Sequence, residues 1–547
     1  MRSRVLIALA LVAVALGVFF RFFGLDHKVY GGDEVYSSLR MFGDTEAQLV
    51  RVAPHFHDAH DLWLVLHPSP SAGSSDWLAP ARVLAAEEPQ HPPVYYELAH
   101  FWVGAFGNSI ATTRLLSAFL SLLALPCAFW LALELYGSRR AGWIALALVA
   151  LSPVQVLYAQ QAREYALWSA AILALSAAVL RAVRCNATST WALVGVLFAF
   201  GLYVFPLTLA IGCGLALGAF AISPRRSVMV PCGLAFGAGL IAYAPWLVIL
   251  FAKRHTISVG IGSSLANRLP PLEVLRAFAG GLRLNFLDLG FERSSALGAA
   301  TTTAVLIVIA LALVFVARRY PARVSLFVLL PLLVSSLALV LPDLIFVGQH
   351  VRTFRYFMPV ILFVDLAVVG LLTSTTSAAS RSRAVLAFVA LVAILGARVL
   401  SCVASARADT WWSDSWDSTI AVAQTINREP QPLLVSDNLL MFSLALSNYL
   451  RPDVAVALRP RCYLCTGRGL PLFATDNVPR GYFTTVFALG PSAQLQRLVQ
   501  VEIGARDAQE RYRCINVFRN CTSDINVLPL VAGVREDSRG AATRSGP

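Results

Sequence analysis

The chain has 547 residues, of which 57% are hydrophobic and 14% are charged. In soluble proteins about a quarter of the residues are charged, so the composition excludes an ordinary soluble fold and predicts a polytopic α-helical membrane protein. The formal net charge of +13 does not indicate nucleic-acid binding. The arginines gather in short turns between apolar runs, which is the pattern that the positive-inside rule produces.

The first apolar segment, residues 5–20, follows a basic start and ends at Arg21. A cleaved signal peptide has the same general order. The run, however, continues past Gly17 into the bulky residues Val18 and Phe19, which make a poor cleavage site. We therefore predict a retained span with a cytoplasmic N-terminus, followed by a long loop over residues 24–109.

Later apolar runs predict ten further spans, about eleven transmembrane helices in all. The run 191–222 is about twelve residues too long for one span. Arginines flank both of its ends, so it should cross twice, with a turn at residues 203–206. The remaining predicted spans are residues 110–136, 141–157, 165–180, 229–251, 296–316, 324–341, 356–372 and 385–402.

The basic turns all fall on one face of this topology, which the positive-inside rule makes cytoplasmic. They are residues 139–140, 181–184, 225–226, 318–323 and 381–383. The long first loop, two further loops and the C-terminal region are then predicted on the extracytoplasmic, or periplasmic, face of the cell inner (plasma) membrane.

From residue 404 the composition becomes that of a soluble domain. Predicted helices at 420–426 and 493–499 and strands at 432–436, 482–489 and 514–518 favour a small α/β domain. The predicted organisation is a transmembrane core over residues 1–403, an extracytoplasmic α/β domain over 404–534 and a disordered tail over 535–547.

Four cysteines lie in this C-terminal region: Cys462, Cys465, Cys514 and Cys521. In an exported domain an even number favours one or two disulfides, whose connectivity the sequence does not define. Cys462 and Cys465 also have the spacing of a zinc or redox motif. No second Cys-x-x-Cys or histidine pair accompanies them, so disulfide formation is favoured.

Two adjacent acids, Asp33 and Glu34, directly follow the first span, in the segment Tyr-Gly-Gly-Asp-Glu-Val-Tyr. A carboxylate at that position is hydrated enough to stay ionised and close enough to the bilayer to meet a lipid-borne substrate. Taken alone, the segment is more typical of a helix start capped by Asp33.

Further polar groups fall on the same predicted outer face. They are His91-Pro92-Pro93 with Tyr95 and Tyr96, Arg163-Glu164-Tyr165, Lys253-Arg254-His255, and Arg352 with Arg355-Tyr356. Each basic group by itself is equally consistent with lipid-headgroup contact or with capping of a helix C-terminus. Together they favour an anion site, and a lipid phosphate is the natural ligand because arginine binds phosphate bidentately.

Two other features have competing interpretations. His55, His57, His60 and two acids within residues 55–61 could bind a metal, but their spacing is not that of helical ligands, so a polar loop or interfacial helix is favoured. Asp365 lies inside a predicted span, where a carboxylate is a functional candidate. We interpret it as a neutral group bonded to a Tyr, Ser or Thr on a neighbouring helix.

The motifs over residues 21–180 resemble those of the GT-C glycosyltransferases of the dolichyl-phosphate-mannose–protein mannosyltransferase type, whose bacterial relatives act on lipopolysaccharide or lipid A. The similar segments are Arg21-Phe-Phe-Gly-Leu-Asp with Gly-Gly-Asp33-Glu34, His91-Pro-Pro-Val-Tyr-Tyr, Phe106-Gly107, Arg114-Leu-Leu-Ser117, Tyr136-Gly137, Ser152-Pro153 and Tyr158-Ala-Gln-Gln-Ala-Arg163-Glu164-Tyr165. Pro245-Trp246 and Arg355-Tyr356 match more weakly.

The resemblance implies transfer of a sugar from a polyprenyl-phosphate donor to a hydroxyl of a glycolipid, glycan or protein acceptor on the non-cytoplasmic face. It implies Asp33 as the catalytic carboxylate, with Glu34 positioning it or capping a helix. The implied substrate-binding residues are His91, Tyr95, Arg163, Glu164, Tyr165, Arg352, Arg355 and Tyr356. No cofactor is certain, although a divalent cation is compatible with the class.

One departure concerns the spacing between Asp33 and His91, which is enlarged by an apparent insertion around residues 55–61 and puts the acceptor specificity in doubt. Two other classes of function stay open. A transporter or flippase of lipid-linked saccharides should show internal repeats and charge deep within its spans, whereas here the charges gather at the outer helix ends. A catalytically inactive scaffold that presents the C-terminal domain is the third alternative.

Overall fold

The computed structural model describes residues 3–68, 76–255, 257, 269–290, 295–346, 348–376, 381–410, 416, 418–462, 483, 485–492, 494–495, 511–515 and 528–531. The chain divides into two compact units. We call residues 1–27 and 80–408 the membrane unit, and residues 28–79 and 409–547 the sheet unit.

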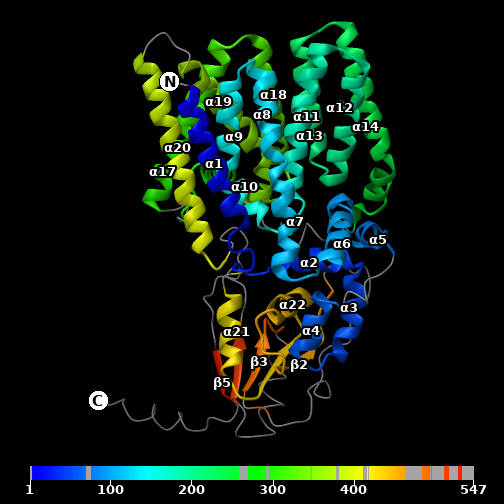
Figure 1. Cartoon of the computed structure of the whole chain (residues 1–547). Helices are drawn as coiled ribbons and strands as arrows, with labels where there is room; N and C mark the ends of the chain where they lie inside the picture. The colour runs from blue at the N-terminus through cyan, green and yellow to red at the C-terminus, as the bar shows by residue number, and fades with distance from the viewer. Residues whose placement is uncertain are drawn as a thin grey trace, which may run out of the picture. The chain divides into compact units, whose positions relative to one another are not determined.

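The membrane unit is helical (Figure 1). Its longer elements are α1 (Ser3–Phe22), α5 (Ala79–Glu87), α6 (Val94–Phe106), α7 (Ile110–Leu122), α8 (Ala124–Tyr136), α9 (Arg139–Ala150), α10 (Pro153–Ala159), α11 (Tyr165–Cys185), α12 (Thr188–Val204), α13 (Thr208–Ile222), α14 (Arg226–Ala252), α16 (Pro271–Leu284), α17 (Ala296–Arg319), α18 (Ala322–Ile345), α19 (Met358–Thr376) and α20 (Arg381–Arg407). Two short 3-10 helices, η3 (His350–Arg352) and η4 (Phe354–Phe357), join α18 to α19.

Every predicted span coincides with a helix or a helix pair, which confirms a multi-pass membrane protein. Among the described residues, eight helices are long and apolar enough to cross a membrane, and the pair α9–α10, bent by 55°, would make a ninth. This count is lower than about eleven because the predicted double crossing forms α12 and α13, of only 17 and 15 residues. The predicted turn between them is confirmed: α12 ends at Val204 and α13 begins at Thr208.

The bend between α9 and α10 exposes helix-end carbonyl groups inside the bundle, and Arg21 satisfies them. Its side chain is fully buried and donates to the carbonyl oxygens of Val149 at 3.1 Å and of Ala150. The last carbonyls of a helix have no intrahelical partner, so a guanidinium at the end of α1 binds two of them. Gly17 permits this approach, since a Cβ there would lie 2.2 Å from the Ala150 oxygen.

Asp365, on α19, has a partner that differs from the one predicted. Arg398 of α20 forms a two-pronged ion pair with it, Nη2 to Oδ1 at 2.6 Å and Nη1 to Oδ2 at 3.2 Å, and Asn285 Nδ2 donates to Oδ1 at 2.9 Å. The interpretation of a neutral carboxyl bonded to Tyr, Ser or Thr was wrong. The guanidinium of Arg398, which lies within the apolar run 385–402, is buried with the carboxyl group and supplies its partner.

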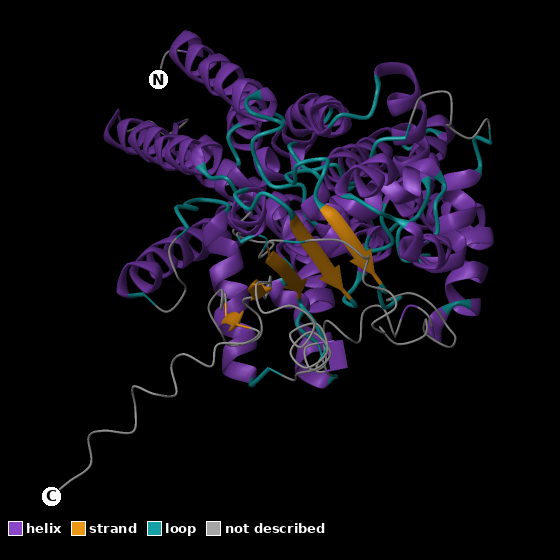
Figure 2. Ribbon diagram, turned by 90° about the horizontal axis from the view of Figure 1, so that it is seen from below, coloured by secondary structure: helices purple, strands orange, loops and turns teal. Residues whose placement is uncertain are grey.

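The sheet unit combines short helices with one five-stranded sheet (Figure 2). Its elements are α2 (Gly32–Phe42), α3 (Glu46–Val52), η1 (Ala53–His55), α4 (Ala59–Leu66), α21 (Thr419–Asn427), β1 (Pro432–Ser436), α22 (Leu440–Ser447), β2 (Ala455–Leu458), β3 (Thr485–Leu489), β4 (Arg511–Ile515) and β5 (Leu528–Val531). The strand order is β2-β1-β3-β4-β5, with parallel pairing except between β4 and β5.

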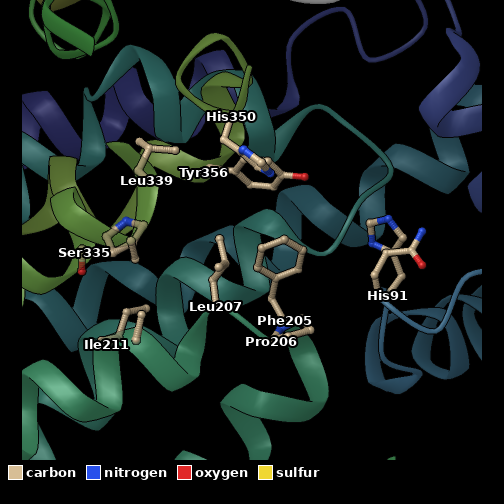
Figure 3. Close-up of a pocket in the computed structure, with 13 residues that line it drawn as sticks. His91, Phe205, Pro206, Leu207, Ile211, Ser335, Leu339, His350 and Tyr356 are labelled. Atoms are coloured by element: carbon tan, nitrogen blue, oxygen red, sulfur yellow. The ribbon is translucent and has the colours of Figure 1, made fainter. Parts of the chain in front are cut away.

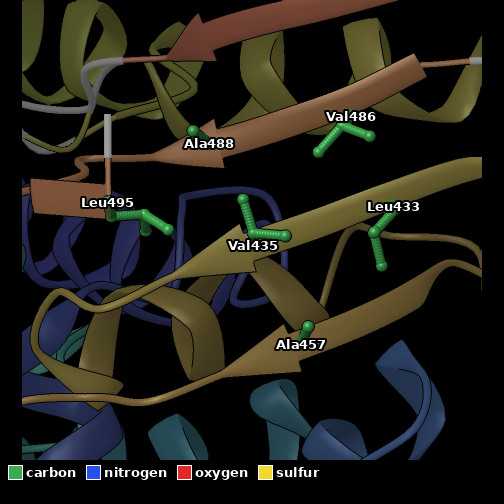
Figure 4. Packing of buried hydrophobic residues seen from close by; sticks show 6 residues of the cluster. All are labelled: Leu433, Val435, Ala457, Val486, Ala488 and Leu495. Carbon is green, nitrogen blue, oxygen red and sulfur yellow. The ribbon is translucent and has the colours of Figure 1, made fainter. Parts of the chain in front are cut away.

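Buried strands form the core of this unit (Figure 4). Leu433 and Val435 of β1 pack with Val486 and Ala488 of β3, and Leu495 covers them. Parallel strands buried on both faces are near-continuous apolar runs, which is why the predicted strand 432–436 coincides with β1. The predicted helix 420–426 corresponds to α21, the predicted strand 482–489 contains β3, and the predicted strand 514–518 overlaps β4 only at Cys514 and Ile515. The strands β2 and β5 were not predicted, but the described residues confirm the small α/β sheet. Most of the predicted helix 493–499 and all of the tail lie outside them.

Part of the first loop belongs to the sheet unit, which the sequence did not indicate. Val29 donates its N–H to the Asp409 oxygen at 2.9 Å, and Tyr30 donates its N–H to the Tyr449 hydroxyl at 2.7 Å. Further along, Val456 of β2 donates to the His57 oxygen at 2.9 Å. Cys462 is disulfide-bonded, and its partner is not among the side chains that the structure describes.

Candidate active site

A group of polar and aromatic side chains gathers in the membrane unit where α10 gives way to α11. The turn at residues 160–164 supplies Arg163 and Glu164, and the segment before α6 supplies His91. We call His91, Tyr96, Arg163, Glu164, Tyr165, Arg355 and Tyr356 the polar cluster. Six of its seven members were predicted as substrate-binding residues, and Tyr96 was not among them.

Glu164 lies at the centre of the polar cluster and is fully buried. Its Oε1 lies 2.8 Å from His91 Nδ1, its Oε2 accepts from the Tyr96 hydroxyl at 3.2 Å, and Arg163 Nε lies 3.4 Å from Oε2. Burial by itself would raise the pKa of Glu164, but the charge of Arg163 and the contacts with His91 outweigh it and lower the pKa to about 2. Glu164 is therefore an ionised carboxylate at neutral pH.

Tyr96 stays protonated beside this carboxylate. Burial raises its pKa well above the ordinary value of 10, although the charge of Arg163 opposes the shift. A neutral phenol donates one hydrogen bond, and Tyr96 donates it to Glu164. The phenol therefore helps to fix the carboxylate that in turn holds His91.

The depressed pKa of Glu164 makes a prediction about acid stability. An acid whose pKa is lower in the folded state contributes stability that is present above its unfolded pKa of 4.5 and is lost as the pH falls through about 2. The wild-type unfolding temperature should therefore fall more steeply below pH 4.5 than that of Glu164→Gln. Thermal unfolding in detergent along a pH series measures this, and equal slopes would contradict the assignment.

Two guanidinium groups share the ring of Tyr165. Arg163 lies 5.7 Å from the ring centroid and Arg355 also lies 5.7 Å from it, while Arg355 is 5.8 Å from the ring of Tyr356. Cations over aromatic faces are attracted by the ring quadrupole. The polar cluster contains these two arginines and one carboxylate, that of Glu164, so one positive charge is left over. This excess charge suits an anionic ligand.

A cavity of about 200 Å³ opens beside the polar cluster (Figure 3). Its polar lining consists of Gln90, His91, Ser335, His350 and Tyr356. The rest of its wall is apolar and comes from α13, α18, the start of α19 and the segment before α13: Phe205, Pro206, Leu207, Ala210, Ile211, Ala338, Leu339 and Pro359. The cavity thus joins an apolar wall made by membrane helices to charged groups.

Aromatic rings link the two histidines of this cavity. The ring of Phe205 lies 6.3 Å from that of His91 and 6.0 Å from that of Tyr356, and the ring of His350 lies 6.2 Å from Tyr356. Phe205 was predicted only as part of a turn, and His350 only as part of a loop. A histidine in a predicted extracytoplasmic loop was the available sequence signal for His350.

Two predicted substrate-binding residues lie outside the polar cluster. The Tyr95 side chain is buried and its hydroxyl is 2.8 Å from that of Ser117, so it supports Tyr96 through the adjacent ring. Arg352 is exposed and donates to Gln349 at 3.2 Å. A role for either in binding substrate stays a prediction.

Asp33 and Glu34 lie in the first turn of α2, in the sheet unit. Glu34 is buried and Asp33 is partly exposed. The interpretation of Asp33 as the helix cap was wrong, because Gly31 occupies the N-cap and no side chain caps this helix. An acid in the first turn still interacts favourably with the helix dipole. Glycine at positions 31 and 32 leaves room for the Trp416 side chain, since a Cβ on Gly32 would lie 2.6 Å from it.

Residues 55–61 run from the end of η1 through a short extended segment into the first turn of α4. Asp58 is the N-cap of α4 and accepts from the Asp61 N–H at 3.0 Å, and Asp61 accepts from the His57 N–H at 2.8 Å. The ring of His60 stacks on Trp63. No group of three or more His, Cys, Asp or Glu suited to a metal occurs in the part of the chain that the structure describes.

Comparison with known proteins gives similarity in fold. No protein-family model and no curated protein matches the sequence. Among solved structures, ArnT from Cupriavidus metallidurans in the apo state matches at 13% identity and a TM-score of 0.49, covering 81% of this chain and 84% of that one. ArnT bound to undecaprenyl phosphate matches at 13% identity and a TM-score of 0.47, covering 94% and 92%.

The archaeal oligosaccharyltransferase AglB from Archaeoglobus fulgidus, in complex with an inhibitory peptide and a dolichol-phosphate, matches at 14% identity and a TM-score of 0.42, covering 82% of this chain and 64% of that one. AglB is an oligosaccharyltransferase, and its structure and one of the ArnT structures hold a polyprenyl phosphate.

Proposed function

We propose that the chain is a GT-C-type glycosyltransferase of the cell inner membrane. It moves a sugar from a polyprenyl-phosphate donor to a hydroxyl of an envelope glycolipid, glycan or protein. The reaction takes place on the non-cytoplasmic face, the side on which the positive-inside rule puts the polar cluster, Asp33 and the C-terminal region. The transferred sugar is a hexose or a pentose.

The observation that carries the proposal is the cavity that joins an apolar wall to the polar cluster. A polyprenyl phosphate has a long hydrocarbon chain and an anionic head. The hydrocarbon chain matches Leu207, Ile211 and Leu339 of the apolar wall, and the anionic head matches the net positive charge of the polar cluster. Arg355 lies beside Tyr356, which lines the cavity. Arg163 does not line it and lies behind His91, with Nη2 at 3.2 Å from His91 Nε2.

The chemistry divides between two kinds of group. Asp33 accepts the proton of the acceptor hydroxyl as the oxygen attacks the anomeric carbon, and Glu34 positions it. As the bond between the anomeric carbon and the phosphate breaks, negative charge grows on the lipid phosphate, which Arg355 and the His91–Arg163 pair stabilise. The donor arrives in the membrane, so no nucleotide-binding fold is required.

Mass spectrometry of envelope glycolipids, glycans and glycoproteins from a deletion strain tests the proposal. We expect the loss of one specific sugar, restored by the wild-type gene. An unchanged set of envelope glycans would contradict it. A flippase would also change these glycans, so the acceptor found in this way should then be incubated with donor and purified protein in detergent micelles, where a transferase forms product and a transporter does not.

A further inference from the structure

His350 is held by a buried acid that the proposed reaction does not use. Its Nδ1 lies 2.6 Å from Asp343 Oδ1, and the Val351 N–H donates to Asp343 Oδ2 at 2.8 Å. The Asp343 side chain is fully buried, whereas that of His350 is 31% exposed and lines the cavity. Both carboxylate oxygens of Asp343 are therefore engaged, and the imidazole is fixed with Nε2 as the nitrogen that a ligand can reach.

The backbone is also fitted to this pair. A Cβ on Gly348 would lie 2.6 Å from Asp343 Oδ1 and 2.9 Å from His350 Nδ1. Contacts below 3.0 Å require atoms to shift, so any side chain at this position would displace the hydrogen bond. The Asp343–His350 pair thus depends on a glycine two residues before the histidine.

A second polar group in the same cavity is unsatisfied. Ser335 lies two turns before Asp343 on α18, is 4% exposed and lines the cavity, and its Oγ has no hydrogen-bond partner among the described residues. A buried hydroxyl without a partner is costly. A ligand that brings polar atoms into this cavity would remove that cost.

We propose that His350, oriented by Asp343, binds the phosphate of the polyprenyl substrate and holds the phosphate monoester released by transfer more tightly than the phosphodiester donor. This inference rests on the proposed function. Arg355 and His350 both flank the ring of Tyr356, at 5.8 and 6.2 Å from its centroid, so a phosphate beside Tyr356 meets both groups.

The preference for a monoester follows from the position of one proton. Nδ1–H is donated to Asp343, so a hydrogen bond between Nε2 and a phosphate oxygen needs one further proton. A phosphate monoester loses its second proton near pH 6. The singly charged monoester can donate its own proton to Nε2, and the doubly charged monoester favours the protonated imidazolium, which then donates to it. A diester has no proton to share and carries only one negative charge, so its bond to Nε2 is weaker.

Binding to the purified full-length protein in nanodiscs tests the inference without sugar transfer. The probes are undecaprenyl phosphate, its methyl phosphodiester and undecaprenol. Losing a charge-assisted hydrogen bond should cost about tenfold in affinity. We therefore expect His350→Gln to bind the monoester about tenfold more weakly, the diester less affected and the alcohol unchanged. Arg276→Gln, which removes an exposed cation of α16 that pairs with Glu273, should leave all three affinities unchanged.

The Gly348→Ala variant keeps the His350 imidazole but displaces it from its hydrogen bond with Asp343, so this variant should also bind the monoester more weakly. It provides a second test if His350→Gln proves unstable. Unchanged monoester affinity in both variants, alongside tight binding by the wild type, would overturn the role of His350 and leave the proposed function intact. A wild type that binds neither phosphate-bearing lipid would instead contradict the proposed function, and this inference with it.

Discussion

Asp33→Asn is expected to reduce sugar transfer by at least about 100-fold, because a positioned general base typically contributes 10²- to 10⁴-fold to a rate. The substitution is isosteric and Asp33 is partly exposed at the start of α2, so the fold should be retained. Binding of polyprenyl phosphate should also persist, since the carboxylate acts on the acceptor hydroxyl. Initial rates of transfer by the purified variant, compared with its lipid affinity and unfolding temperature, measure the effect.

Asp26→Asn is the matched control for this experiment. Asp26 is exposed, lies seven residues before Asp33 in the chain and has no role in the proposed reaction. The Asp26→Asn variant should transfer sugar at the wild-type rate. Wild-type turnover by Asp33→Asn would show that another group takes the proton.

Arg163→Gln should produce the largest loss of stability in the polar cluster. The substitution leaves Glu164 fully buried without its guanidinium partner, and breaking a buried ion pair on one side costs about 3–5 kcal/mol. It should also weaken binding of polyprenyl phosphate, because Arg163 Nη2 contacts His91 at 3.2 Å and provides positive charge behind it. Chemical unfolding in detergent and lipid binding in nanodiscs measure the two effects.

The double variant Arg163→Gln/Glu164→Gln separates these roles. Removing both partners eliminates the uncompensated carboxylate, so stability should recover by a few kcal/mol. Binding of the lipid phosphate should stay weak if Arg163 contributes to the anion site. If both stability and lipid binding recovered, the role of Arg163 would be limited to neutralising the charge of Glu164.

The sequence by itself determined the membrane architecture and predicted three of the five described strands, β1, β3 and part of β4. Apolar runs of the right length became helices, the turn at residues 203–206 ended α12, and the buried run Pro432–Ser436 became β1. These features are local, because hydrophobic length and turn residues act within a single segment. The neighbours Arg163, Glu164 and Tyr165 were also visible as one polar turn between apolar helices.

Only the tertiary structure decided which polar groups meet. His91 and Glu164 are 73 residues apart in the sequence, and Arg398 meets Asp365 through the packing of α20 on α19. Helices that are apolar all round carry no pattern that fixes their rotation, so sequence could not identify the partner of a buried charge. For the same reason the sequence did not indicate the role of His350, whose position beside the cavity depends on the buried Asp343. Residues 28–79 belong to the sheet unit through hydrogen bonds to segments far away in the sequence, which no local pattern predicts.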